Sequence, residues 1–471
     1  MSKDPILVLQ MQRMGDLILS FPLLIMLLKK YPGHPVWVAA EEIFFKGLMP
    51  IAPEVTFFPS NALPRMYGHK FHMVLNLSHR PEAGALASKV RSDKWIGPLQ
   101  NEDGSAYIEG PWQLYRASLT HNNRHNNFHW ADLNTLDVIP YPVLKSTVWN
   151  PVKIDPGKNG IGLFLGASDP AKRPDADFWA KLAKNLLKKG LNPVLLGGEN
   201  ERSLGREVAS LVGIPKLNMV GRFNIRGLVR FMSSLELLVT PDTGPMHLAA
   251  WLGLPVLNLS MGPVNAWDTG PLQPSHLILR SNISCRGCWQ CPRGLACHRH
   301  FSPGRTASLI ASVLKKGLGD EGKDYLAKLD LPYQEILFSS RREGLYSLEP
   351  LKEGTSGSLR NLLGEFWRQF FGTALGLWTE EKMLACWQNI QSGYSRLPPA
   401  FDYSLSILTK EYSFALKKRS PLSPGFWESV PPLLRPLSGY LHMQLQNGDY
   451  GQKSFASGAS MLELFSSITE P

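Results

Sequence analysis

Short apolar runs alternate with longer stretches of helical period along the first half of the chain. Residues 6–9, 36–39 and 73–77 are predicted to be buried strands, and residues 17–30 a helix that ends near Pro32 and Gly33. Strands that alternate with helices are typical of βαβ units and a mostly parallel sheet. The N-terminal part is therefore expected to form a Rossmann-like domain.

A second series of the same kind follows a proline-punctuated stretch at residues 140–158, which we interpret as a linker. The predicted elements are strands at 161–165, 193–196 and 235–240, and helices at 177–189, 201–212 and 225–234. The pattern predicts an α/β protein with two Rossmann-like domains, residues 1–150 and 151–325, that face a cleft.

The pattern changes after about residue 325. Residues 359–418 combine helical periodicity with many aromatic side chains, and prolines interrupt the chain repeatedly between Pro398 and Pro436. Residues 326–471 are therefore predicted to form a mainly α-helical C-terminal extension.

Size and charge narrow the class of protein. A chain of 471 residues is too long to fold around a single hydrophobic core, so two or three domains are expected. Its composition, with 44% apolar and 19% charged residues, is typical of a globular protein. The longest apolar stretch, Leu17–Leu28, contains Pro22 and is too short to cross a bilayer, and the chain opens with no signal-peptide pattern. The expected location is cytoplasmic. The net charge of +11 favours an anionic partner, and without a nucleic-acid-binding motif we expect a phosphorylated substrate or an anionic membrane face.

Residues 239–259 carry the most informative local pattern. A short strand is followed by a polar turn, a short helix at about 246–252 and another strand; the turn and first helical residues include Asp242, Thr243, Gly244 and His247. Helix N-termini at the carboxyl ends of parallel strands bind anions through free N–H groups. This segment predicts a phosphate-bearing ligand, and the alternative is that Asp242 and Thr243 only cap the helix.

Three other strand ends carry candidate site residues. Asp16 follows the first strand, where it is expected either to cap the next helix or to act as a general base in the cleft. Ser168 and Lys172 follow strand 161–165 and suit a diphosphate. Glu199 and Glu201 follow strand 193–196, where a carboxylate can accept hydrogen bonds from ribose hydroxyls.

Four of the five cysteines, Cys285, Cys288, Cys291 and Cys297, fall within thirteen residues. Four thiolates at short spacing can surround one ion, so the run predicts a structural metal site, with zinc, mononuclear iron and an iron–sulfur cluster all open. His121, His125 and His129 recur every four residues, but the asparagines between them are poor helix formers and argue against a metal site. Cys386 is expected to pack in a core.

Taken together, these motifs resemble the ADP-heptose:lipopolysaccharide heptosyltransferases, inverting glycosyltransferases with the GT-B fold. The resemblance covers roughly residues 5–318. The segments that carry it are Gln12–Pro22, Leu75–Arg80, the loop from Gly166 to Trp179, Gly197–Glu199, Asp242–His247 with Leu248–Pro255, Gly262–Pro263 and Thr269–Pro271.

The resemblance implies a role for each matched residue. Asp16 aligns with the catalytic base, Ser168 and Lys172 with groups on the ADP phosphates, and Glu199 or Glu201 with the acid on ribose. Asp242, Thr243, Gly244 and His247 align with the sugar-nucleotide loop. It also implies catalysis without a metal cofactor, an ADP-sugar donor, a glycolipid or glycan acceptor, and peripheral contact with the inner membrane.

Two departures keep other functions open. The extension has no counterpart in short family members, and a protein-modifying branch holds iron with four cysteines. The acceptor can therefore be a protein rather than a lipopolysaccharide core. A GT-B enzyme that uses a UDP-sugar and a non-catalytic metal sensor or scaffold are the rival hypotheses.

Overall fold

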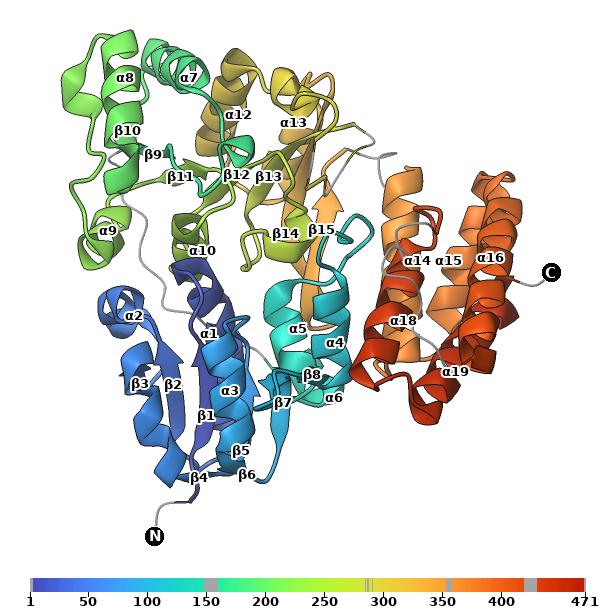
Figure 1. The fold of residues 1–471 in the computed structure, drawn as a ribbon. Helices are drawn as coiled ribbons and strands as arrows, with labels where there is room; N and C mark the ends of the chain where they lie inside the picture. The colour runs from blue at the N-terminus through green and yellow to red at the C-terminus, as the bar shows by residue number, and fades with distance from the viewer. Residues whose placement is uncertain are drawn as a thin grey trace.

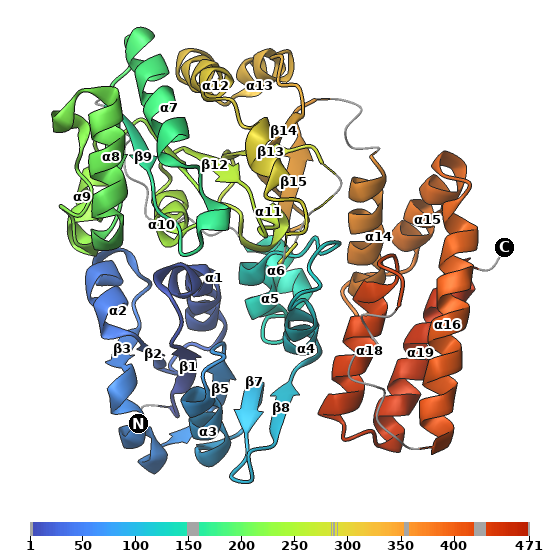
Figure 2. The same cartoon turned by 45° about the horizontal axis from the view of Figure 1, so that its top comes forward.

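The computed structural model describes residues 3–147, 160–283, 285, 288–289, 291–352, 358–418 and 430–469. Two α/β units lie one above the other, and a helical bundle lies beside both of them (Figures 1 and 2). The predicted fold class is confirmed: two parallel-sheet units of Rossmann type are followed by a helical C-terminal region.

The first unit is built on a six-stranded sheet of order β3-β2-β1-β5-β7-β8, in which only the pairing of β7 with β8 is antiparallel. Its strands are β1 (Ile6–Gln10), β2 (Val36–Ala40), β3 (Thr56–Pro59), β5 (Met73–Asn76), β7 (Trp95–Gln100) and β8 (Ala106–Glu109). Its helices are α1 (Met14–Lys30), α2 (Glu42–Leu48), α3 (Pro81–Lys89), α4 (Pro111–Ser118), α5 (Trp130–Leu136) and α6 (Tyr141–Ser146). The sequence did not predict β7, because Gly97 and Pro98 break the apolar run that would mark a buried strand, nor the four-residue strands β3 and β8.

The second unit is built on a seven-stranded sheet of order β10-β9-β11-β12-β13-β14-β15. Its strands are β9 (Ile161–Phe164), β10 (Pro193–Leu196), β11 (Leu237–Thr240), β12 (Val256–Ser260), β13 (Leu277–Ser281), β14 (Gln334–Arg342) and β15 (Leu345–Pro350). Its helices are α7 (Ala176–Lys188), α8 (Arg202–Val212), α9 (Ile225–Met232), α10 (Gly244–Trp251), α11 (Ala266–Thr269), α12 (Pro303–Lys316) and α13 (Asp320–Ala327).

The hairpin of β14 and β15 differs from the expected helical extension. Both strands pair antiparallel at the edge of the second sheet, so this sheet continues beyond residue 325, where the extension was predicted to begin. The predicted linker at 140–158 is described only in part: residues 141–146 form α6, and residues 148–159 lie outside the described chain.

The extension itself is a bundle of long helices: α14 (Leu359–Ala374), α15 (Glu381–Gly393), α16 (Leu397–Lys418), α18 (Arg435–Asn447) and α19 (Gln452–Thr469). Aromatic side chains, among them Phe366, Trp367, Phe401 and Phe465, are fully buried at its centre, as the aromatic periodicity predicted. Cys386 lies on α15 against this core. The described helices include none that is long and apolar enough to span a membrane.

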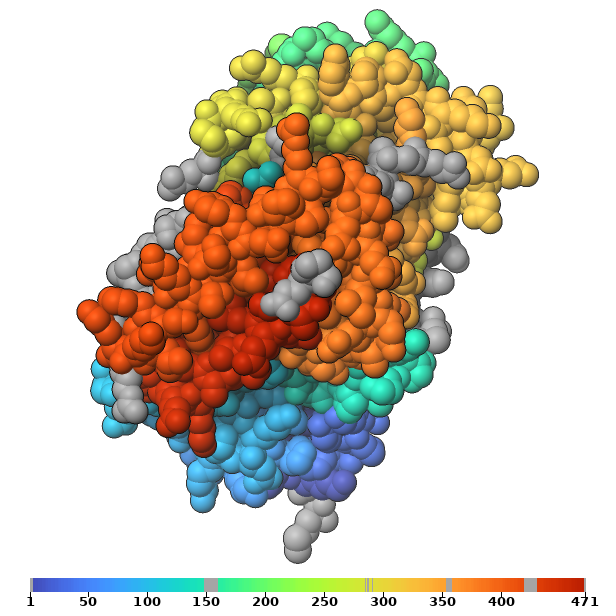
Figure 3. Space-filling model, turned by 90° about the vertical axis from the view of Figure 1, so that its right-hand side faces the viewer, coloured from blue at the N-terminus to red at the C-terminus, as the bar shows by residue number. Residues whose placement is uncertain are grey.

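The bundle packs on the side where the two units meet (Figure 3). The ring centroids of Tyr115 on α4 and Phe371 on α14 are 4.5 Å apart. The amide of Asn122 donates to the carbonyl of Arg435 at 2.8 Å, and that of Asn447 donates to the carbonyl of Ile108 at 2.9 Å. These contacts fasten the bundle to the first unit.

Candidate functional site

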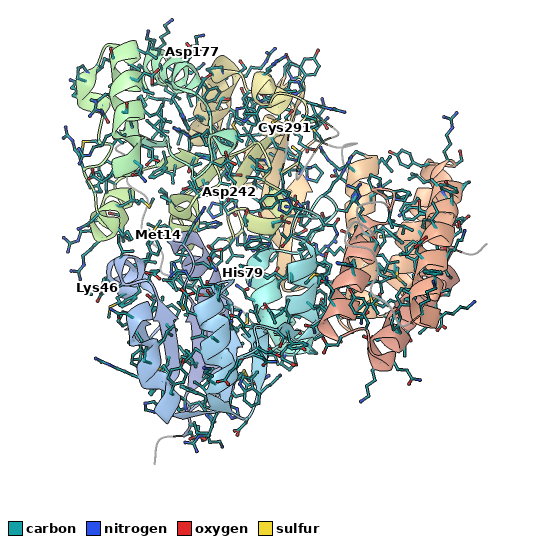
Figure 4. The ribbon with its side chains drawn as sticks, in the orientation of Figure 1. Met14, Lys46, His79, Asp177, Asp242 and Cys291 are labelled. Carbon is teal, nitrogen blue, oxygen red and sulfur yellow. The ribbon has the colours of Figure 1, made fainter. Side chains whose placement is uncertain are left out.

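The N-termini of α1 and α10, one from each unit, touch at the junction of the two units. A Cβ at Gly15 would lie 2.9 Å from Cδ2 of His247, and a Cβ at Gly244 would lie 2.7 Å from Cε of Met14. A side chain at Gly15 would therefore crowd the buried ring of His247, whereas one at Gly244 would displace only the end of the Met14 side chain. In Figure 4, Met14 and Asp242 lie where the units meet, and His79 lies below them on the first unit.

Four predicted site residues come together here, and we call Asp16, Lys172, Asp242 and His247 the junction site. Nζ of Lys172 lies 3.8 Å from Oδ2 of Asp242, and Nε2 of His247 lies 3.8 Å from Oδ1 of the same carboxylate. Burial lowers the pKa of His247, while the charges of Asp242 and Asp16 oppose that shift. The imidazole is therefore neutral at pH 7 and within range of both carboxylates.

Asp16 does not cap α1 in the predicted way. The helix begins at Met14, so Asp16 is its third residue rather than the residue before it, and its Oδ2 accepts a hydrogen bond from the backbone N–H of Arg13 at 3.3 Å. The helix therefore includes Met14 and Gly15, although glycine is a poor helix former and the apolar pattern begins only at Leu17. The carboxylate still lies in the first turn of the helix.

The loop of Lys172 is held in place by a second loop of the same unit. Residues Pro170–Lys172 form a 3₁₀ turn capped by Asp169, whose Oδ1 accepts from the N–H of Ala171 at 2.9 Å. Gly262 packs on this turn with a φ of +69°, and a Cβ there would lie 2.1 Å from the carbonyl oxygen of Ala171. The Gly-Pro pair after β12 is thus a packing requirement of the Lys172 loop. Ser168 is exposed at the start of the same loop.

The two candidate glutamates after β10 face different surroundings. Glu199 is exposed and forms an ion pair with Arg202, whose Nε and Nη2 each donate to one of its carboxylate oxygens. Glu201 turns inward: its Oε2 accepts from the N–H of Gly198 at 2.8 Å, and its carboxyl carbon would lie 2.6 Å from a Cβ at Gly166. Glu201 therefore lies against the loop that leads to Ser168, and Glu199 does not.

Two residues beside Asp16 were not singled out from the sequence. Arg116 on α4 is buried, donates to Oδ1 of Asn134 at 2.9 Å, and lies 4.9 Å from the Trp130 ring. Burial lowers the pKa of Arg116 and the charge of Asp16 raises it, so the two groups are within electrostatic range. Burial and Arg116 together lower the pKa of His79. Only the fold reveals this cluster, because these residues are some 60 to 100 positions from Asp16 in the sequence.

The three histidines of the 121–129 segment do not share a helical face. His121 has a φ of +57° in a turn, and His129 is the N-cap of α5. The ring of His129 is fully used: Nε2 donates to the carbonyl of Gly270 at 3.0 Å, and Nδ1 accepts from the N–H of Ala131 at 3.2 Å. The four-residue spacing therefore does not lie on one helix, and both ring nitrogens of His129 are engaged within the protein.

A second buried polar cluster, which we call the asparagine contact, also joins the two units. It consists of Asn123 and Asn126 from the first unit and Asn265 and Asp268 from the second. Oδ2 of Asp268 accepts from Asn123 at 2.5 Å, and Oδ1 accepts from Asn126 at 2.6 Å and from Asn265 at 3.1 Å. Asn265 also donates to the carbonyls of Asn123 and Asn126, each at 2.9 Å.

The four clustered cysteines line one cavity with Arg280 and Arg360, at the end of β13. Burial and the neighbouring cysteines raise the pKa of Cys288 to about 11. Within the described residues, no group of three or more His, Cys, Asp or Glu side chains has a geometry that could hold a metal ion. The cavity lies close to the Lys172 loop, because Nε2 of His298 donates to the carbonyl of Ala171 at 2.8 Å.

Comparison with known proteins gives a consistent result. The model of glycosyltransferase family 9 (heptosyltransferase) matches residues 56–296. Lipooligosaccharide heptosyltransferase 2 of Campylobacter jejuni is 28% identical over 195 residues, which are 40% of this chain and 59% of that protein. Lipopolysaccharide heptosyltransferase 2 of Salmonella typhimurium is 25% identical over 320 residues, 58% of this chain and 87% of that protein.

The chain thus spans about 59% of the length of the Campylobacter relative. Among solved structures, the family 9 glycosyl transferase of Veillonella parvula superposes with a TM-score of 0.53 at 20% identity. The superposition covers 67% of this chain and 98% of that structure. At this identity the likeness concerns the fold alone.

Proposed function

The chain belongs to glycosyltransferase family 9, and we propose that it transfers a heptose or related sugar from an ADP-sugar to a hydroxyl of a lipopolysaccharide core or another cell-surface glycan. The observation that carries the proposal is the junction site. A carboxylate of the first unit faces a cation, a neutral imidazole and a helix N-terminus of the second unit. These are the groups that an acceptor hydroxyl and a departing diphosphate need.

In the proposed reaction, Asp16 accepts the proton of the acceptor hydroxyl, whose oxygen attacks the anomeric carbon of the donor. The bond between that carbon and the phosphate oxygen breaks, and the electron pair leaves with the diphosphate, so the configuration at the anomeric carbon inverts. A general base must be ionised to act. The guanidinium of Arg116 lies within electrostatic range of Asp16, which is in the first turn of α1.

The leaving diphosphate is proposed to lie between Lys172, Ser168 and the N-terminus of α10, with Thr243 and Gly244 at its first turn. The N–H groups of a helix N-terminus and a lysine ammonium stabilise negative charge as it develops on the leaving group. This arrangement would replace a divalent cation. Glu201 is the better candidate for the ribose contact, because Glu199 is engaged by Arg202.

We also propose that the four clustered cysteines hold one metal centre of structural rather than catalytic function. Thiolates are the ligands that zinc and iron share, and the four side chains already line a common cavity. Zinc, mononuclear iron and an iron–sulfur cluster all remain candidates. Elemental analysis of protein purified without oxygen tests this part by itself.

The donor is tested by thermal shift and by transfer. ADP should raise the melting temperature strongly and UDP should not, since only the cognate nucleotide binds the folded state tightly. Mass spectrometry of an acceptor incubated with an ADP-heptose should show the added sugar. Stabilisation by UDP alone would favour the UDP-sugar alternative. Binding of neither nucleotide, together with no transfer, would favour the non-catalytic scaffold.

A peripheral contact with the inner membrane stays part of the proposal. It is supported by the net charge of +11 and by the lipid-linked acceptor that the proposed activity would use. Sedimentation of the protein with vesicles that contain anionic lipid, compared with neutral vesicles, tests it.

A further inference from the structure

The cavity of the four cysteines carries an unbalanced buried positive charge. Arg280 lies at the end of β13 and Arg360 in the first turn of α14, and both line this cavity. Both guanidinium groups donate to the same oxygen, Oε1 of Glu335 on β14. Side chains of Arg280 and Glu335 are only 5% and 4% exposed, and that of Arg360 is 12% exposed. Two cations and one anion leave a net charge of +1.

The guanidinium groups also keep unused donors. Nη1 and Nη2 of Arg280 and Nε of Arg360 are buried and have no hydrogen-bond partner within the described chain. No acidic residue is among the described residues that line the cavity. Burying a charge and its N–H groups without a partner is unfavourable, so such an arrangement calls for a negative group in the cavity.

The charge of the cysteine site decides which chemical state satisfies the arginines. Four neutral thiols or two disulfides carry no charge. A divalent ion bound by four thiolates carries a charge of −2, because each ligand has lost its proton. A metal bound by four thiolates therefore offsets the buried excess of +1 and accepts hydrogen bonds at its sulfur atoms, whereas four thiols or two disulfides supply no negative charge.

We propose that Arg280 and Arg360 are the charge partners of an anionic metal–thiolate centre, and that they set how tightly this centre holds its metal. The proposal rests on the metal site proposed above. Arg360 also donates to the carbonyl of Ile283 at 2.9 Å, two residues before Cys285. The first turn of the helical extension is thereby fastened to the segment that leads into the cysteines.

Release of metal to a competing chelator tests the proposal through charge. Arg280→Gln removes one positive charge, and we expect the centre to lose its metal about 10 to 100 times more readily, which is the usual effect of a lost outer-shell partner. Glu335→Gln raises the net charge of the arginine cluster from +1 to +2 and should slow the release. The double variant returns the cluster to +1 and should recover part of the affinity lost in Arg280→Gln.

The matched control is Arg305→Gln, which removes an arginine from an exposed pair with Asp330 on the same unit and should release metal as the wild type does. If the wild-type protein contains no metal, the metal site itself is wrong. If the wild type is loaded and Arg280→Gln and Glu335→Gln both release metal at its rate, the metal site stands and the role of the arginines is overturned. Alkylation and mass spectrometry that find two disulfides in the wild type would overturn both.

Hydrogen exchange gives a second readout that does not depend on catalysis. Removing the metal should increase amide exchange in the first turn of α14, because Arg360 then faces an uncompensated cavity. Exchange in α19, which does not line the cavity, serves as the internal reference. Equal exchange in α14 with and without metal would contradict the proposed fastening.

Discussion

The two α/β units touch through two polar regions that differ in how completely their groups are paired. In the asparagine contact, both oxygens of the charged Asp268 accept hydrogen bonds from amides of the other unit, and a neutral amide oxygen, Oδ1 of Asn123, has no partner within the described chain. In the junction site, Oδ1 of Asp242 and Nδ1 of His247 are buried without a hydrogen-bond partner in the described chain. Buried polar atoms without partners are costly, and at the junction site a bound ligand would supply the missing bonds.

This difference indicates that the junction site binds a ligand and that the asparagine contact holds the two units together. In the junction site, the ammonium group of Lys172 and the imidazole of His247 each lie 3.8 Å from the carboxylate of Asp242. These separations are longer than hydrogen bonds, so the three groups can still bind a ligand. In the asparagine contact, amides of both units occupy the carboxylate of Asp268, so we expect this cluster to hold the two units together. Changes in the first region should therefore alter catalysis with little loss of stability, and changes in the second should do the reverse.

The largest expected effect is on catalysis, from Asp16→Asn. The amide cannot accept the acceptor proton, and loss of a general base lowers kcat by about 10² to 10⁴-fold. Isothermal titration with ADP should give nearly the wild-type Kd, because the proposed nucleotide contacts lie on the second unit. Glu42→Gln, an exposed carboxylate in the first turn of α2, is the control and should retain full activity. Full turnover by Asp16→Asn would remove Asp16 from the mechanism.

The next effect is on stability, from Asp268→Ala. The substitution leaves the buried amides of Asn123 and Asn126 without their acceptor, and each such loss costs about 1–3 kcal/mol, so we expect a total of about 3 kcal/mol. Urea unfolding followed by fluorescence measures it. Asp177→Ala removes an exposed i,i+4 pair with Lys181 and should change stability by less than about 0.5 kcal/mol. An Asp268→Ala protein as stable as wild type would refute the holding role of the asparagine contact.

Most of the secondary structure around both regions could be predicted from local patterns. The strand at 193–196 matches β10 residue for residue, and the turn around Asp242 lies between β11 and α10 as expected. These elements carry clear apolar runs bounded by glycine and proline, so the chain signals them within a few residues.

What could not be predicted depends on distant pairings. Strands β14 and β15 join the second sheet only because β13 offers an edge, and no local pattern specifies which edge a strand will use. Arg116 appears beside Asp16 because α4 packs next to α1 through α5, a relation that sequence spacing does not encode. The local sequence of the asparagines indicates only poor helix formers, because their partner Asp268 lies 142 positions from Asn126 along the chain.

A smaller effect is on the pH dependence of stability. It is caused by His129, whose ring donates to the carbonyl of Gly270, two residues after Asp268. Burial lowers the pKa of His129 to about 3 from an ordinary value of 6.5, so the unfolded chain binds a proton that the folded protein excludes. Stability is then complete above pH 6.5 and falls as the pH drops below it, by about 2 kcal/mol between pH 7 and pH 5 for one such group. His129→Gln does not titrate. It should therefore lower the slope of the unfolding free energy against pH by the contribution of about one proton. An unchanged pH slope would contradict it.

The smallest expected effect is on donor binding and concerns the contact between His298 and the Lys172 loop. Nε2 of His298 donates to the carbonyl of Ala171, next to Lys172, so His298 should act as a positioning residue for the Lys172 loop. One neutral hydrogen bond contributes about 1 kcal/mol, and we therefore expect His298→Ala to raise KM for the donor several-fold with little change in kcat. His298→Gln keeps a donor and should restore most of the affinity, while the exposed neighbour Arg299→Ala should behave as wild type. If KM is unchanged in His298→Ala, the Lys172 loop is positioned by Asp169 and Gly262 alone, and the cysteine segment is separate from donor binding.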